Sequence, residues 1–176
     1  MNVYTGLDLF NIHLPKKYIN SQAGLLIHPA SINRHLKHAY ELFLESSKVK
    51  LRALFGPQHG IYGHTQDNMV EWKGFNDPKT GLPVYSLYGE TRQPTEEMLE
   101  EIDVMIIDLQ DIGARYYTFI WTMDLCMEAC HKLRKSVIVL DRPNPITGIE
   151  IEGTVLEPEY SSFVGLKPLP IRHGMT

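Results

Sequence analysis

Short apolar runs recur along the chain and alternate with segments whose apolar residues return at helical spacing. The run "DVMIIDL" (103–109) places four consecutive apolar residues between its two aspartates rather than one at every second position, which is typical of a strand covered on both faces in a parallel sheet. Comparable runs occupy residues 23–28, 49–55, 82–89 and 136–141, the last ending in Asp141. We expect these runs to form the strands of a buried sheet.

The segments between these runs predict helices. Residues 31–46 place apolar side chains, Leu36 among them, on one helical face, and Ser31 is the expected N-cap. A second helix is expected to begin near Thr95, where acidic residues follow a proline, and a third to span 116–133. The alternation predicts a doubly wound α/β fold, with a mostly parallel sheet and helices on both faces.

Composition narrows the classes of protein to consider. The chain has 176 residues, 43% of them hydrophobic, and a formal net charge of -4, which suits one globular domain. Without a basic stripe, neither nucleic acid nor a membrane surface is an expected partner. The start has no signal-peptide pattern and no apolar run is long enough to span a bilayer, which predicts a cytoplasmic protein. Cys126 and Cys130 are expected to be buried thiols.

Polar residues follow the ends of the predicted strands, in the motifs "GPQHG", "YGETR", "DLQDIGARYYT" and "DRPNP". In an open α/β sheet, ligands bind beyond the carboxyl ends of the strands, so we expect these motifs to form one rim. Its polar residues are Gln58, His59, Glu90, Arg92, Asp108, Gln110, Asp111, Arg115, Asp141, Arg142 and Asn144. Each alone is equally consistent with a cap or a structural ion pair, whereas the cluster is typical of a functional site.

Several chemistries can be compared with this rim. The first strand is followed by "HPASINRH", not by a G-x-G-x-x-G turn, and no Walker phosphate loop or G-x-S-x-G motif occurs, so we expect no cofactor. A metal site built from His59, His64, Asp67 and Asp108 stays an alternative, although its spacing matches no recognised ligand set. Carboxylates with amides, arginines and aromatic rings around a cleft favour glycoside chemistry.

Long motifs spread over residues 24–176 resemble those of the DUF1343 family. They are "GLLIHPAS", "FGPQHG", "DPKTGLPVYSLYGETRQPT", "DVMIIDLQDIGARYYTFIWTM", "VLDRPNP", "SFVGL" and "PIRHGMT". The resemblance implies an exo-β-N-acetylmuramidase of the NamZ type, which removes N-acetylmuramic acid from the non-reducing ends of peptidoglycan fragments. It implies a Rossmann-like N-terminal domain, here residues 1–176, and an active-site cleft shared with a C-terminal domain. A fragment without that domain is expected to be inactive and to self-associate.

The same resemblance implies a glutamate at the position of Gln58, and an amide cannot transfer a proton as a carboxyl group can. Either another acid has taken this role, or the chain binds glycans without cleaving them. Glu90 is the first candidate for the acid, and the other expected catalytic residues are Asp108, Asp111 and His59.

The expected saccharide-binding residues complete the candidate site. They are Gln58, Gln110, Arg115, Tyr117, Asp141, Arg142, Asn144 and His173. Arg115 and Arg142 are expected to hold the lactyl carboxylate of muramic acid through bidentate contacts. Pairing with Asp111 or Asp141 is an equally open alternative for these arginines.

Overall fold

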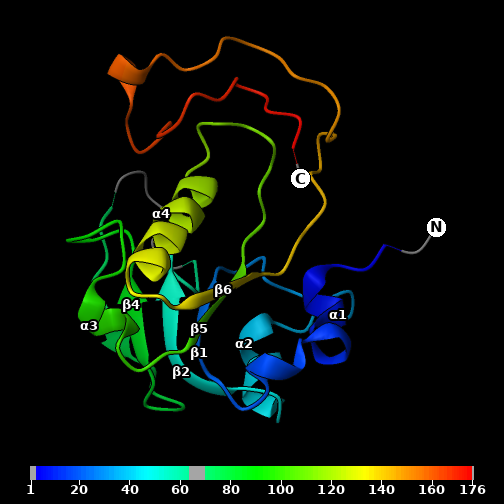
Figure 1. Ribbon diagram of the computed structural model, residues 1–176, viewed down its shortest axis with the longest axis vertical. Helices are drawn as coiled ribbons and strands as arrows, with labels where there is room; N and C mark the ends of the chain where they lie inside the picture. Colours follow the sequence, from blue (N-terminus) through cyan, green and yellow to red (C-terminus); the bar gives the residue numbers. More distant parts are fainter. Residues whose placement is uncertain (1–2, 64–69, 176) are drawn as a thin grey trace.

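The computed structural model describes residues 3–63 and 70–175 (Figure 1). A single sheet runs through its centre in the strand order β3-β4-β2-β1-β5-β6. The strands are β1 Gln22–Ile27, β2 Lys50–Gly56, β3 Phe75–Asn76, β4 Pro83–Ser86, β5 Val104–Asp108 and β6 Ser136–Val139. All neighbouring strands are parallel except the antiparallel β3–β4 pair at one edge. The predicted doubly wound, mostly parallel sheet is therefore confirmed.

The strand order reverses direction at the centre of the sheet. β1 pairs with β2 on one side and with β5 on the other, because the chain crosses back over the sheet after β4. The carboxyl ends of β1 and β5 therefore form a topological switch point, where the loops diverge and leave a crevice. The segments after β5 and β6 leave the sheet at the same edge, as predicted, since these strands are parallel.

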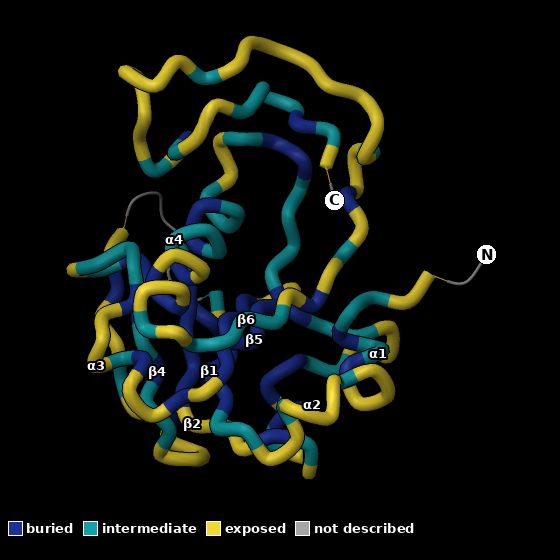
Figure 2. The backbone as a smooth tube through the Cα atoms, in the orientation of Figure 1, coloured by how far each residue is buried: buried dark blue, intermediate teal, exposed yellow. Residues whose placement is uncertain are grey.

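Helices cover both faces of the sheet. One face packs against α1 (Gly6–His13) and α2 (Ala39–Glu45), and the other against α3 (Glu96–Leu99) and α4 (Phe119–Lys132). Strand side chains alternate between the two cores, so that in β5 Ile106 joins the first and Ile107 the second. Figure 2 shows the buried residues concentrated in the strands and the inner helix surfaces.

Local hydrogen bonds decide where the helices begin. α3 begins directly after Thr95, as expected, and Thr95 caps it by accepting from the Met98 backbone N–H. The predicted helix at 31–46 is wrong over its first half, because α2 begins only at Ala39. There the Asn33 side chain accepts backbone N–H bonds from residues 35 and 37 and holds a turn in place of the helix. Leu36 has a φ of 60° in that turn and is 78% exposed.

Other elements also differ from expectation. The last strand, β6, lies at an edge of the sheet and is only partly buried, so that the prediction of a buried strand there is wrong. The apolar runs did not indicate α1 or the short β3. Cys126 and Cys130 are buried free thiols on α4, as expected. No helix in the described ranges is long and apolar enough to cross a bilayer.

The C-terminal segment, residues 145–175, contains one 3₁₀ turn (Pro158–Tyr160) and otherwise consists of turns, bends and irregular chain. It lies beyond the carboxyl edge of the sheet, alongside the loop that follows β5 (Figure 1). Isolated bridges join Arg172 to Ala114 and to Glu152. Because of this position (Figure 1), the C-terminal segment extends the rim at which the site lies. Figure 2 shows that much of the segment is exposed.

Candidate functional site

The carboxyl ends of the strands open into a cavity of about 900 Å³. This volume is typical of sites that bind small molecules. Its walls come from the loops after β1, β2, β4 and β5, from the start of α4 and from residues 162–164. The aromatic residues of the lining are Tyr88, Tyr116, Tyr117, Phe119 and Phe163, and the side chains with strong hydrogen-bonding groups are His28, Gln58, His59, Arg92, Gln110, Thr118 and Ser162.

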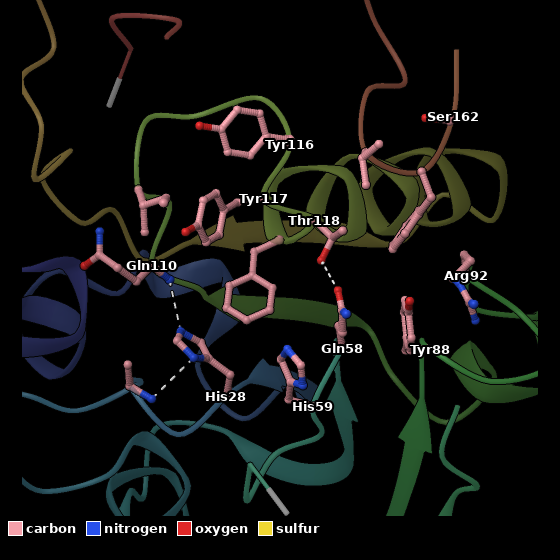
Figure 3. A pocket seen from close by; sticks show the side chains of 15 residues that line it. His28, Gln58, His59, Tyr88, Arg92, Gln110, Tyr116, Tyr117, Thr118 and Ser162 are labelled. Carbon is pink, nitrogen blue, oxygen red and sulfur yellow. Dashed lines mark hydrogen bonds between the residues drawn. The ribbon is translucent and has the colours of Figure 1, made fainter. Parts of the chain in front are cut away.

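The turn after β2 presents Gln58 and His59 to the cavity (Figure 3). His59 has a φ of 72°, a left-handed conformation that costs roughly 1–2 kcal/mol for a residue with a side chain. The following Gly60 N–H closes the turn on the Pro57 carbonyl, which also accepts from the Trp72 indole. Strained backbone that is held by surrounding contacts occurs often at functional sites.

Thr118 links this turn to α4. As the residue before the helix, it is placed to cap the first turn, but its side chain makes no capping hydrogen bond. The Thr118 hydroxyl instead donates to the Gln58 side-chain oxygen at 3.0 Å (Figure 3). This contact fixes the Gln58 amide against the cavity wall, at the expense of a better helix cap.

His28 lies directly after β1, at the switch point, with its ring 4.6 Å from that of Phe119. Its Nε2 faces the Gln110 N–H at 3.2 Å and its Nδ1 the Ala30 N–H at 3.3 Å. A neutral imidazole accepts at one nitrogen only, so one of these contacts at a time is a full hydrogen bond. Burial lowers the His28 pKa to about 4, with a smaller effect from nearby Arg142, and the ring is therefore neutral at pH 7.

Asp108 and Arg142 form a buried ion pair that does not line the cavity. The guanidinium donates to both carboxylate oxygens, at 2.6 and 2.8 Å, and to the Ile32 carbonyl. Burial raises the pKa of the Asp108 carboxyl, against the opposing effect of Arg142. The pair joins the ends of β5 and β6, so its geometry is that of a structural brace.

Three further predicted residues contact the C-terminal segment instead of the cavity. Arg115 donates to the carbonyls of residues 154 and 169, and the Asn144 amide donates to that of residue 175. The Asp111 carboxylate lies 3.0 Å from the buried His173 ring and also accepts from the Gly113 N–H. These contacts hold the segment against the loop after β5.

Glu90 and Asp141 are exposed and do not line the cavity. Arg92, which follows Glu90 by two residues, pairs with Glu71. Of the predicted site residues, the cavity brings together Gln58, His59, Gln110 and Tyr117, together with Arg92 of the predicted rim. No aspartate or glutamate occurs among the described residues that line it.

The predicted alternative of a metal site is not supported by the described residues. Among them, no group of three or more His, Cys, Asp or Glu side chains is placed to hold an ion. His59 and Asp108 belong to the described residues, whereas His64 and Asp67 lie outside them.

Sequence reasoning missed several residues of the lining, among them His28, Tyr88, Phe119 and Phe163. His28 had a usable signal, because it directly follows the first predicted strand. Tyr88 lies in the "YGETR" motif and Phe119 in "DVMIIDLQDIGARYYTFIWTM", but an aromatic residue by itself does not indicate a cavity. Phe163 belongs to the "SFVGL" motif, but nothing in that motif places it near the rim, because its segment reaches the cavity only through tertiary contacts such as the tilted ring contact with Tyr88.

Several known proteins are similar to this chain in sequence and in fold. The family described as "Exo-beta-N-acetylmuramidase NamZ, N-terminal" matches residues 23–176. Over 174 residues the chain is 48% identical to the Bacillus subtilis peptidoglycan beta-N-acetylmuramidase NamZ, covering 99% of this chain and 42% of that protein.

Two crystal structures of DUF1343 family proteins from Bacteroides fragilis are also similar. One has a TM-score of 0.87 and 44% identity over 97% of this chain and 42% of its own. The other has a TM-score of 0.82 and 32% identity over 99% of this chain and 44% of its own. The chain therefore spans less than half the length of each of these relatives.

Proposed function

This chain belongs to the family of N-terminal domains of the exo-β-N-acetylmuramidase NamZ, and we propose that its cavity binds the terminal N-acetylmuramic acid of peptidoglycan fragments as part of a glycosidase site. The observation that carries this proposal is the cavity at the switch point, with aromatic rings and uncharged hydrogen-bonding side chains around one space. Rings of this kind stack on sugar faces, while amides and hydroxyls bind sugar hydroxyl and acetamido groups.

We propose that a second domain completes the cleft. The greater length of the relatives supports this, and so does the C-terminal segment, whose exposed apolar side chains include Ile149, Ile151, Val155 and Tyr160. Apolar residues gathered on one exposed segment are typical of an interaction surface. The chain alone is then expected to show no muramidase turnover and to self-associate.

The described cavity wall is unusual for a glycosidase in the groups that it offers for proton transfer. A glycosidase commonly uses paired carboxyl groups, but none lies among the described residues of the lining, and Gln58 cannot act as an acid. Of the predicted catalytic residues, His59 alone lines the cavity. We therefore assign proton transfer on this wall to His59, with any carboxyl group supplied by the second domain.

A second candidate function is glycan binding without hydrolysis. The same observation favours it, because a cavity wall with amides in place of carboxylates can hold a sugar without activating its glycosidic bond. The two candidates agree on the ligand and differ in turnover, which makes them separable by one assay on the full-length protein.

The test is release of a chromogenic leaving group from an N-acetylmuramide and from the matching glucosaminide. We expect turnover of the muramide alone, and a loss of about a hundredfold or more in His59→Asn. Asparagine tolerates the left-handed backbone at this position, so this variant changes the ring and preserves the turn. Glu90→Gln is the matched control and should be unaffected, because Glu90 is exposed outside the cavity.

The outcomes separate the two functions. Saccharide binding without turnover of either substrate would establish the second candidate in place of the first. Gln58→Glu would then be expected to restore at least some hydrolysis, since it places a carboxyl group on the cavity wall. Neither binding nor turnover would refute both proposals.

A further inference from the structure

The described part of the cavity wall carries positive charge only. Among the described residues of the lining, Arg92 is the only lysine, arginine, aspartate or glutamate. Arg92 follows β4 in the "YGETR" motif. Figure 3 shows Arg92 and Tyr88 at one end of the cavity and His28 towards the other, with Gln58 and His59 in between. A lone cation on a wall without carboxylates favours a ligand that carries a negative charge.

The Arg92 guanidinium is held in place by its surroundings. It lies 3.9 Å from the centre of the Tyr88 ring and 5.5 Å from that of Phe163, a stacking arrangement that orients its plane. Nη1 donates to the Gly89 carbonyl at 2.7 Å and Nη2 to Glu71 at 3.1 Å. The side chain is thus positioned before any ligand arrives.

Arg92 nevertheless keeps binding capacity. A guanidinium has more N–H donors than these two contacts use, and 29% of the Arg92 side chain is exposed. Glu71 is 60% exposed, so solvent weakens its neutralising effect on the arginine. A carboxylate bound inside the cavity would interact with the same guanidinium in a less polar environment, where the attraction is stronger.

The other arginines of the predicted site are already committed to the protein. Arg142 is bound by Asp108 and is 7% exposed, and Arg115 donates to backbone carbonyls of the C-terminal segment. Neither lines the cavity. The expectation that these two residues hold the lactyl carboxylate is therefore not supported by their placement.

We propose that Arg92 is the specificity-determining residue of the site, binding the lactyl carboxylate that distinguishes N-acetylmuramic acid from N-acetylglucosamine. This inference rests on the proposed saccharide-binding function. Tyr88 and Phe163 hold the guanidinium plane, and the aromatic and amide groups elsewhere in the cavity bind the sugar ring that both saccharides share.

The experiment is a binding titration of the full chain with three probes: N-acetylmuramic acid, its methyl ester, and N-acetylglucosamine. The ester keeps the lactyl group and removes only its charge. We expect the acid to bind at least about tenfold more tightly than either neutral probe, the range of a charge-assisted hydrogen bond. Arg92→Gln should abolish the preference for the acid over the ester, and Arg92→Lys should retain part of it.

Lys50→Gln is the matched control, because Lys50 is exposed at the amino end of β2, at the opposite edge of the sheet. It removes the same charge and should leave the preference intact. Equal binding of acid and ester, or a preference that survives in Arg92→Gln, would overturn the role of Arg92 while leaving the saccharide site standing. A uniform loss of affinity for all three probes in Arg92→Gln would show a structural role only. Failure of every probe to bind the unaltered chain would overturn the proposed function and this inference together.

Discussion

Replacing His28 by glutamine is expected to remove an acid-induced loss of stability. The side chain is 7% exposed, and its burial is the main reason that its pKa falls from 6.5 to about 4. Below pH 6.5 the unfolded chain takes up a proton on this ring, whereas the folded chain does so only near pH 4. The stabilising contribution of neutral His28 is therefore complete above the unfolded pKa and is lost as the pH falls through this window.

The magnitude follows from the difference between the two pKa values. Each pKa unit corresponds to about 1.4 kcal/mol, so the full effect is about 3 kcal/mol. Between about pH 7 and pH 4.5, where the folded ring is still mostly neutral, the expected loss is about 2 kcal/mol. This is a large fraction of the roughly 5–15 kcal/mol by which domains are stable.

The assay is urea unfolding followed by far-ultraviolet circular dichroism at these two pH values. The quantity to compare is the change in free energy of unfolding with pH, since the substitution also alters packing against Phe119. Glutamine keeps a hydrogen-bonding side chain but does not titrate, so His28→Gln should lose about 2 kcal/mol less than the unaltered chain. The exposed His35→Gln variant controls for the loss of a histidine. Parallel losses in the unaltered chain and in His28→Gln would refute the reasoning.

Three further predictions concern buried residues outside the cavity lining. Asp108→Asn should lower the free energy of unfolding by about 3–5 kcal/mol, because it leaves the Arg142 charge buried and poorly paired, and a loss below 1 kcal/mol in urea unfolding would contradict this. Gly113→Ala should destabilise by about 1–3 kcal/mol, since φ is +83° and a Cβ would lie 2.6 Å from the Asn144 side chain; an unchanged melting temperature would count against it. The Asp77 pKa is lowered to about 2 by hydrogen bonds from residues 40, 62 and 80 that outweigh its burial, so its stabilisation is present above about pH 4 and lost towards pH 2. Asp77→Asn should flatten that acid dependence in the same unfolding assay, and an unaltered slope would disprove the assignment.

The strands were the most predictable part of this protein. Continuous apolar runs such as "DVMIIDL" have few alternatives to a strand buried on both faces, and β5 lies where that run predicts it. Helix limits were less predictable, because Asn33 and Leu36 fit a helical pattern in sequence while a side-chain hydrogen bond of Asn33 favours a turn. The apolar run of β6 is comparable to those of the buried strands, so it could not reveal that β6 forms an edge of the sheet.

The sequence by itself determined that the sheet is mostly parallel and that Gln58, Asp108 and Arg142 follow its strands at one edge, because strand and helix alternate along the chain. Only the tertiary structure decided which of these side chains line the cavity. Asp108 and Arg142 neutralise each other beneath the rim, whereas Gln58 and Arg92 line the cavity itself. The physical reason is that a charge at a strand end can be matched by the neighbouring strand or by a ligand, and the choice depends on which groups the fold brings within hydrogen-bonding distance.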